Sequence, residues 1–247
     1  MSSTAEKVAL IVGAGDYIGS AIAKRFAQEG YLVCLGRRKV EKLQPLVDEI
    51  SELGGKAKAF ALDARDEANV EHVFAEIENT VGEIDVMIFN VGANVQFPIL
   101  ETTSRVFHKV WEMACFAGFL NGREAAKYMV PRKRGSIFFT GATASVKGNA
   151  GFGAFSSAKA GLRSLAQAMA RELGPQNIHV AHLVIDAGVD TEWVHQLMKD
   201  RGIDESSLPE DGLMKPESVA QAYWQLHQQS RDAWTFELDI RPYAEKW

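Results

Sequence analysis

The sequence predicts an α/β protein built on one doubly wound parallel sheet of about seven strands, with helices on both faces. Apolar runs of strand length recur seven times, and the early ones lack the polar alternation of a half-exposed strand. Segments with helical periodicity separate most of these runs. No Pro/Ser-rich linker or shift in composition divides the 247 residues, so we predict a single domain over residues 1–247.

Each element is predicted from a local pattern. The first helix repeats Ile18, Ile22 and Phe26 after a glycine-rich turn, and the second tolerates Pro45 only near its first turn. A later helix carries an apolar stripe from Leu162 to Leu173 and should stop at Gly174-Pro175. The expected strands are residues 8–12, 31–35, 58–62, 85–89, 136–140, 179–185 and 235–240.

Charge and composition argue against several classes of partner. The formal net charge is -5, and the basic runs at 37–39 and 132–134 are short, so we expect no nucleic-acid partner and no binding to anionic lipid. The MSSTAEK start lacks the layout of a signal peptide, and no run approaches the roughly 20 apolar residues of a membrane span. Cys34 and Cys115 lie among apolar residues without metal-ligand spacing. We therefore expect a cytoplasmic protein with reduced thiols and no metal.

The turn after the first predicted strand reads VGAGDYIGSAIA, with glycines at 13, 15 and 19. Backbone N–H groups and a helix N-terminus can hold a pyrophosphate at such a turn. The spacing departs by one residue from the G-x-G-x-x-G pattern, and a tight turn with close helix packing is the alternative. Its context favours a nucleotide site, because polar residues follow the next three strands at the edge where open parallel sheets bind ligands. These are Arg37 and Arg38, Asp63, and the segment Asn90-Val91-Gly92.

With these motifs, the chain from about residue 7 to 240 resembles the short-chain dehydrogenase/reductase family, which implies a Rossmann-type fold and a nicotinamide dinucleotide cofactor. The family pattern T-G-x-x-x-G-x-G corresponds to Val12–Gly19, with Tyr17 at the middle glycine, and N-N-A-G corresponds to Phe89–Gly92. Tyr17 either narrows the phosphate site or shifts the cofactor. The resemblance implies a cofactor site of Gly13, Gly15, Tyr17, Ile18, Gly19, Arg37, Arg38, Asp63, Ala64, Asn90, Gly92, Lys159 and Thr191.

The catalytic positions of the family are mostly replaced. Its Tyr-x-x-x-Lys pair, the Ser thirteen residues before the Tyr and the Asn on the preceding long helix correspond to Phe155, Lys159, Ala142 and Cys115. Only Lys159 is retained, and the resemblance implies that it binds the nicotinamide ribose. Phenylalanine has no proton to give. Phe155 and Lys159 start a core-facing helix stripe, where a lysine either serves a ligand or extends its stem to solvent.

Two functions therefore stay open. The first is an oxidoreductase on a carbonyl or alcohol with altered proton transfer, and the second is a catalytically inactive dinucleotide-binding sensor or scaffold. Other groups that could supply a proton are a water held by Lys159, His182, His195, and the hydroxyls of Thr140, Thr143, Ser145, Ser156 and Ser157.

Arg37 and Arg38 after the second strand favour NADP(H) over NAD, because arginine there accommodates a 2′-phosphate. Asp16 points weakly the other way, and an ordinary solvated turn is the alternative interpretation of the arginines. Thr191 is implied to meet the nicotinamide carboxamide. A homodimer or homotetramer is also implied by the resemblance, through the helix near 103–130 and the helix that carries Lys159.

Residues 188–215 are interpreted as a substrate lid over a partly apolar pocket. Five of its side chains suggest that pocket: Trp193, His195, Leu197, Met198 and Leu213. The substrate is expected to be a small molecule that the sequence does not identify. The C-terminal LDIRPYAEKW departs from the family's Asp-Gly-Gly ending and predicts no function.

Overall fold

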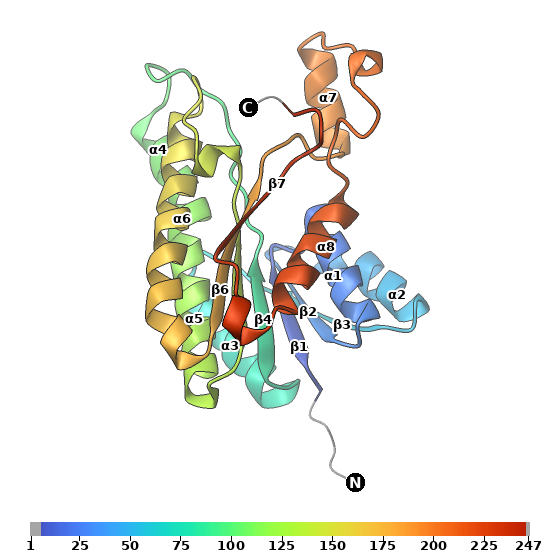
Figure 1. Cartoon of the computed structure of the whole chain (residues 1–247), viewed down its shortest axis with the longest axis vertical. Helices are drawn as coiled ribbons and strands as arrows, with labels where there is room; N and C mark the ends of the chain where they lie inside the picture. The colour runs from blue at the N-terminus through green and yellow to red at the C-terminus, as the bar shows by residue number, and fades with distance from the viewer. Residues whose placement is uncertain (1–5, 246–247) are drawn as a thin grey trace.

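A computed structural model describes residues 6–245, which form one seven-stranded parallel sheet with helices on both faces (Figure 1). Each of the seven predicted runs forms a strand, within two residues of the predicted bounds at most ends. Residues 1–5 of the MSSTAEK start and residues 246–247 of the LDIRPYAEKW end lie outside the described residues. The strands are β1 (Val8–Val12), β2 (Leu32–Arg37), β3 (Lys56–Ala61), β4 (Ile84–Phe89), β5 (Ser136–Thr140), β6 (His179–Ile185) and β7 (Glu237–Ile240).

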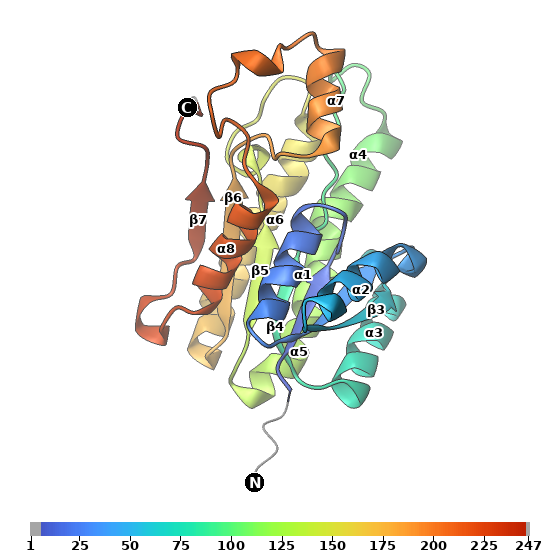
Figure 2. The ribbon, with the colours of Figure 1, turned by 90° about the vertical axis from the view of Figure 1, so that its right-hand side faces the viewer.

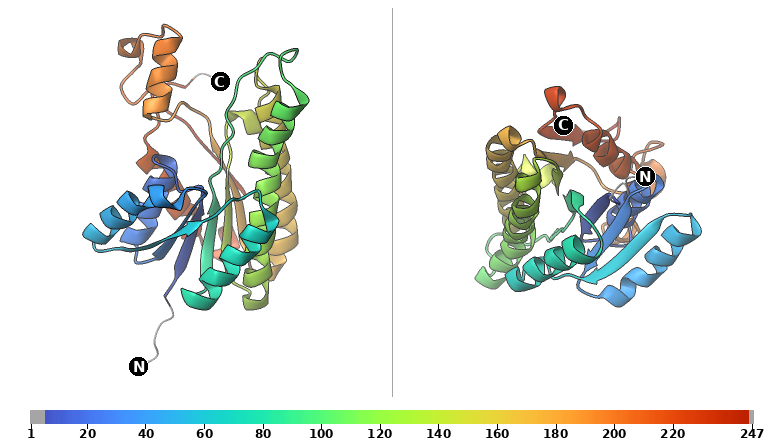
Figure 3. Two further views of the ribbon diagram at one scale, coloured as in Figure 1. Left: turned by 180° about the vertical axis from the view of Figure 1, so that it is seen from behind. Right: turned by 90° about the horizontal axis from the view of Figure 1, so that it is seen from below.

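Two helical layers enclose the sheet, as the view from below shows (Figure 3, right). One layer consists of α1 (Ile18–Gln28), α2 (Gln44–Glu52) and α8 (Pro216–His227), which stand together in front of the sheet in Figure 2. The other consists of α3 (Glu67–Thr80), α5 (Ala117–Arg132) and α6 (Gly153–Leu173), and α4 (Ser104–Trp111) extends it. Helix α7 (Glu192–Asp200) belongs to neither layer and projects beyond the sheet at the top of Figure 1.

Successive residues of each central strand are buried in opposite layers. In β1, Ala9 and Ile11 pack against the α1/α2/α8 layer, and Leu10 and Val12 pack against the α3/α5/α6 layer. This two-sided burial is the physical reason that the strands are continuous apolar runs. Each buried aliphatic side chain contributes about 1.5–3 kcal/mol relative to exposure.

Local signals fix most helix ends. Pro45 occupies the first turn of α2, where its missing N–H costs no helical hydrogen bond. Helix α6 ends at Leu173, directly before Gly174-Pro175, as predicted. The helix expected near 103–130 is interrupted by a π-helical turn over Glu112–Phe116, which separates α4 from α5. Such a turn inserts a residue into the helical repeat, and the apolar periodicity of the sequence did not indicate it.

In the strand order β3-β2-β1-β4-β5-β6-β7, the chain adds strands on one side of β1 up to β3 and then on its other side from β4 onward. The turns that follow the neighbouring strands β1 and β4 therefore lead to opposite faces of the sheet and leave a crevice between them at its carboxyl edge. The described residues contain no helix with the length and hydropathy needed to cross a membrane.

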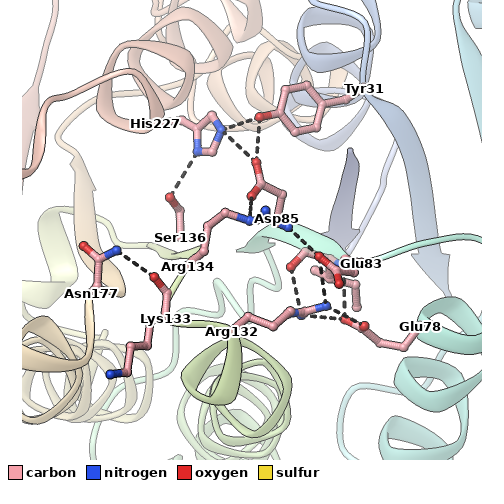
Figure 4. A network of polar contacts seen from close by, with 11 residues as sticks. Tyr31, Glu78, Glu83, Asp85, Arg132, Lys133, Arg134, Ser136, Asn177 and His227 are labelled. Atoms are coloured by element: carbon pink, nitrogen blue, oxygen red, sulfur yellow. Dashed lines mark hydrogen bonds and ion pairs between the residues drawn. The ribbon is translucent and has the colours of Figure 1, made fainter. Parts of the chain in front are cut away.

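A buried polar network ties α8 to the amino edge of the sheet (Figure 4). The hydroxyl of Tyr31 donates to Oδ2 of Asp85 at 2.9 Å and lies 2.6 Å from Nε2 of His227. On its other side, Nδ1 of His227 lies 3.1 Å from Oγ of Ser136, and Nε of Arg134 is 3.2 Å from Oδ1 of Asp85. Burial raises the pKa of Tyr31 far above its ordinary value, so its hydroxyl stays a donor.

A second buried pair joins β6 to β7. His182 is fully buried, and its Nδ1 lies 3.1 Å from Oε2 of Glu237, which also receives two hydrogen bonds from Arg163 of α6. Burial lowers the pKa of His182 to about 4. In the unfolded chain a histidine takes up its proton near pH 6.5. Between these two values the unfolded state binds more protons, so stability falls as the pH falls.

We predict that Tyr31→Phe lowers the free energy of unfolding by about 1–3 kcal/mol, because buried Asp85 and partly buried His227 each lose a hydrogen-bond partner. Urea denaturation measures the change. Tyr128→Phe is the control, since the Tyr128 hydroxyl forms no hydrogen bond with any described residue. Equal stability of Tyr31→Phe and wild type would contradict the network's role.

We also predict that His182→Gln flattens the acid limb of the stability curve. From pH 6.5 to pH 5 the wild type should lose about 2 kcal/mol more than the variant, because only the wild type carries this depressed pKa. Denaturant titrations across this range measure both curves. His227, whose pKa burial also lowers to about 4, is present in both proteins and cancels. Parallel curves would show that His182 does not titrate as its burial requires.

Candidate functional site

Two adjoining cavities open at the carboxyl edge of the sheet. The larger, about 570 Å³, lies between the glycine turn, the ends of β4 and β5, α6, and residues 185–197. The smaller, about 220 Å³, lies between the glycine turn and the ends of β2 and β3. They share Gly13, Gly15 and residues 90–92. Together the cavities bring all the cofactor-site residues expected from the sequence to one place: Gly13, Gly15, Tyr17, Ile18, Gly19, Arg37, Arg38, Asp63, Ala64, Asn90, Gly92, Lys159 and Thr191.

The glycine turn is packed on one side and open on the other. Gly13 has φ +85°, and a Cβ there would stand 2.9 Å from the carbonyl oxygen of Asn90. A Cβ at Gly19, the second residue of α1, would stand 2.6 Å from the carbonyl oxygen of Gly13. This position therefore has room only for a glycine. Gly15 instead faces open space. The cradle therefore fits a phosphate group, which the free N–H groups at the start of α1 would bind.

Tyr17 stands at the N-cap of α1 and makes no side-chain capping hydrogen bond. The residue is 37% exposed and lines the larger cavity. The side chain therefore borders the phosphate cradle without closing it.

The smaller cavity has a charged rim. Nη1 of Arg37 pairs with Oδ1 of Asp16 at 2.9 Å, and Arg38 is exposed beside it. Arg65, which sequence reasoning missed, holds Asp63 with hydrogen bonds of 2.9 Å to Oδ1 and 2.6 Å to Oδ2. These bonds hold the pKa of Asp63 below its ordinary value. The place of Arg65 two residues after Asp63 at a strand end was the available signal.

Lys159 is buried in the wall of the larger cavity, with 2% of its surface exposed. Its Nζ donates to the carbonyl oxygens of Thr140 at 2.7 Å and Val91 at 3.3 Å, and lies 5.9 Å from the centre of the Phe155 ring. The alternative that its stem reaches solvent is therefore wrong. Burial lowers the pKa of Lys159 to about 8, so the ammonium can release a proton near neutral pH.

The three positions that the family resemblance pairs with catalytic residues place apolar or neutral atoms near this lysine. Ala142 and Phe155 line the same cavity, and Phe155 is 7% exposed within a cluster of small apolar side chains. Cys115 lies in the π-helical turn and packs closely against Gly161 of α6. A Cβ added at Gly161 would stand only 3.0 Å from the Sγ of Cys115. Burial raises the pKa of Cys115, so its thiol stays neutral.

The hydroxyl groups near Lys159 are engaged or turned away. Thr143 donates to Oδ1 of Asp186 at 2.6 Å, and Ser157 donates to the carbonyl oxygen of Ala154 at 2.9 Å. Ser145 accepts from the backbone N–H of Ala142 at 3.1 Å. Thr140 is hydrogen-bonded to Asn90 and Tyr223, and Ser156 lines an adjoining cavity on the far side of Phe155 rather than the cavity of Lys159.

Neither of the two candidate histidines, His182 and His195, lines the two cavities. His182 lies behind Gly141, and His195 is on α7, where Nε2 pairs with Asp190 at 2.8 Å and Nδ1 with Glu205 at 3.2 Å. Hydrogen bonds to these two carboxylates raise the pKa of His195. Among the described residues, the titratable side chains that line the larger cavity are Asp16, Tyr17 and Lys159.

The predicted lid contains α7 and returns to its start through a bridge between Val189 and Met214. Thr191 caps α7 by accepting from the backbone N–H of Val194 at 3.2 Å. Trp193 and Leu197 line the larger cavity, whereas Met198 and Leu213 do not. A third cavity of about 780 Å³ continues past Ala142 and Phe155, between the loop after β5 and the end of β6.

Comparison with known proteins agrees with this geometry. Residues 7–202 match the family model for short chain dehydrogenase. A short-chain dehydrogenase from Rhodopseudomonas palustris is 53% identical, with TM-score 0.82 over 96% of this chain and 99% of that one. The 3-oxoacyl-[acyl-carrier-protein] reductase FabG of Thermotoga maritima is 30% identical over 216 residues, which cover 87% of each chain.

The fold also resembles that of a metagenomic short-chain oxidoreductase solved in complex with NADP, at 24% identity and TM-score 0.80 over 96% of this chain and 97% of that one. The matched segment includes the glycine turn, Asn90 and Lys159, the residues that meet in the larger cavity. This chain belongs to the short-chain dehydrogenase family.

Proposed function

We propose that this protein is an NADP(H)-dependent oxidoreductase acting on a carbonyl or alcohol, with Lys159 in place of an aromatic hydroxyl as the group that gives and takes the proton. A bound nicotinamide dinucleotide would supply or accept the hydride. One observation carries the proposal: the Lys159 ammonium is buried in the cavity wall, beside two positions, Ala142 and Phe155, that bear no hydroxyl.

The choice of Lys159 follows from its place and its chemistry. Asp16 and Tyr17 belong to the glycine turn, so Lys159 is the titratable group among the described residues that lies next to Ala142 and Phe155. Two backbone carbonyls fix its Nζ. A pKa of about 8 suits an acid that must also be regenerated near neutral pH.

The preference for NADP(H) rests on Arg37 and Arg38 at the rim of the smaller cavity. The Asp16 partner of Arg37 has 70% of its side chain exposed, and exposed ion pairs are weak. A 2′-phosphate, with more charge and more acceptor oxygens, would compete well for the guanidinium. The NADP bound by the metagenomic relative supports the same choice.

A second candidate function is a dinucleotide-binding sensor or scaffold without turnover. The packing of Phe155 favours it, because the ring fills its site within an apolar cluster and leaves no donor. Both functions keep the cofactor cavities and differ only in whether a proton can be delivered.

The proposal extends to the substrate, the oligomeric state and the cellular location of the protein. We propose a small-molecule substrate that enters between residues 188–215 and the third cavity, and a homodimer or homotetramer formed through the α4–α6 side. Support for that surface comes from the half-exposed aromatic side chains of Phe107, Trp111 and Phe119. The composition supports a cytoplasmic location.

We predict that the wild type binds NADPH more tightly than NADH and that Arg37→Ala removes most of the difference. A charged hydrogen bond contributes about 1.5–3 kcal/mol, so the preference should fall roughly 10- to 150-fold. Calorimetry with both nucleotides measures it. Asp16→Asn is the matched control and should retain or increase the preference. A wild type that favours NADH would reject NADP(H), and one that binds neither nucleotide would reject the cofactor proposal itself.

We further predict that carbonyl reduction by the wild type is lost as the pH rises through about 8, because Lys159 must be protonated to act as the acid. Lys159→Met should abolish turnover.

Phe155→Tyr combined with Ala142→Ser should raise the rate by roughly 10²–10⁴-fold, the contribution of a positioned general acid. Nicotinamide absorbance measures turnover. An inert wild type whose double variant is active would favour the sensor, as would inertness of both with NADPH bound.

A further inference from the structure

We propose that Tyr223 of α8 is a positioning residue of the cofactor site: its buried hydroxyl completes a hydrogen-bond chain that holds the Asn90 side chain against Gly13. The inference rests on the proposed nucleotide binding at the two cavities. Tyr223 itself lines neither of them.

The chain has three links and crosses four elements. The hydroxyl of Tyr223 lies 2.7 Å from Oγ1 of Thr140, the last residue of β5. Oγ1 of Thr140 lies 3.1 Å from Oδ1 of Asn90, directly after β4. Nδ2 of Asn90 lies 3.2 Å from the carbonyl oxygen of Gly13, in the turn after β1. Tyr223 is completely buried and Thr140 is 7% exposed, so solvent competes little for these bonds.

The direction of every bond follows from its end at Gly13. A carbonyl oxygen can only accept, so the Asn90 amide must present its NH₂ group to Gly13 and its oxygen to Thr140. The hydroxyl hydrogen of Thr140 is therefore committed to Asn90. Oγ1 of Thr140 can then only accept from Tyr223, which makes Tyr223 the donor. Burial raises the pKa of Tyr223 well above its ordinary value, so the donor proton stays in place.

The chain acts where the backbone ladder has ended. The pairing of β4 with β5 stops at Phe89 and Phe139, one residue before Asn90 and Thr140. Beyond that point their side chains join the two strand ends across the mouth of the larger cavity. The carbonyl oxygen of Thr140 also accepts from Lys159 at 2.7 Å. Tyr223 thus supports the residue that holds both Asn90 and Lys159.

Without the Tyr223 hydroxyl, Oγ1 of Thr140 loses the donor that leaves its own hydrogen for Asn90, and the Thr140 hydroxyl can rotate away. The Asn90 side chain would then keep only its bond to Gly13 and hold the glycine turn less firmly. The Tyr223 ring also packs against Phe138, with 6.2 Å between ring centres. Tyr223→Phe keeps that packing and removes only the hydroxyl, so it isolates the effect.

The test measures the dissociation constant for NADPH by calorimetry, together with unfolding by urea, in four single variants and one double variant. Tyr223→Phe and Thr140→Val should weaken binding about three- to tenfold, the net value of roughly one hydrogen bond. Thr140→Ser keeps the hydroxyl and should bind like the wild type. Tyr31→Phe is the matched control, since it removes a buried, hydrogen-bonded tyrosine hydroxyl at the opposite edge of the sheet and should leave NADPH affinity unchanged.

The double variant Tyr223→Phe/Thr140→Val should bind no more weakly than Thr140→Val alone, because both changes break the same chain. Wild-type affinity in Tyr223→Phe would overturn the inference while the proposed function stands. Equal weakening by Tyr31→Phe would also overturn it, since general loosening would then explain both. If Tyr223→Phe does not fold, equal binding by Thr140→Ser and Thr140→Val overturns it. A wild type that binds no NADPH would overturn the proposed function and this inference together.

Discussion

The contact between Asn90 and Gly13 is the constraint on which the site depends. The backbone N–H of Asn90 donates to the carbonyl oxygen of Val12 at 2.8 Å, and its own carbonyl leaves no room for a Cβ on Gly13. The ends of β1 and β4 can approach this closely only with a glycine in the turn. The crevice at the switch point, the open face of Gly15 and the start of α1 all follow from that approach.

Lys159 is the second feature that needs an explanation, because a buried ammonium is costly unless it is hydrogen-bonded. Its two carbonyl partners, from Thr140 and Val91, offset part of that cost, and burial still lowers its pKa. A lysine that only served packing could be replaced by an apolar side chain. Its retention beside Phe155 and Ala142 is understandable if a ligand in the cavity uses it, and the oxidoreductase and the sensor share that requirement.

The sequence predicted the strands, the sheet with helices on both faces and the cavity residues well, because each depends on local or pairwise rules. The continuous apolar runs of the central strands are typical of a parallel sheet covered on both faces, and residues that follow parallel strands meet at one edge. It failed where the outcome depends on partners distant in the chain. Thr143 looked available beside the missing serine until Asp186, 43 residues later, proved to accept its proton. Arg65, by contrast, was overlooked although it lies only two residues after Asp63, which it holds at the rim of the smaller cavity.

The sequence by itself therefore determined the family, the sheet and the identity of the residues at the cofactor edge, since periodicity and motif spacing encode these along the chain. Only the tertiary structure decided which hydroxyls are already hydrogen-bonded and how deeply Lys159 is buried. It also decided that the Tyr223 hydroxyl, 83 residues later in the chain, bonds to the Thr140 side chain at the end of β5. Hydrogen-bond direction and desolvation depend on three-dimensional neighbours, and no pattern along one chain specifies which neighbours a buried polar group will have.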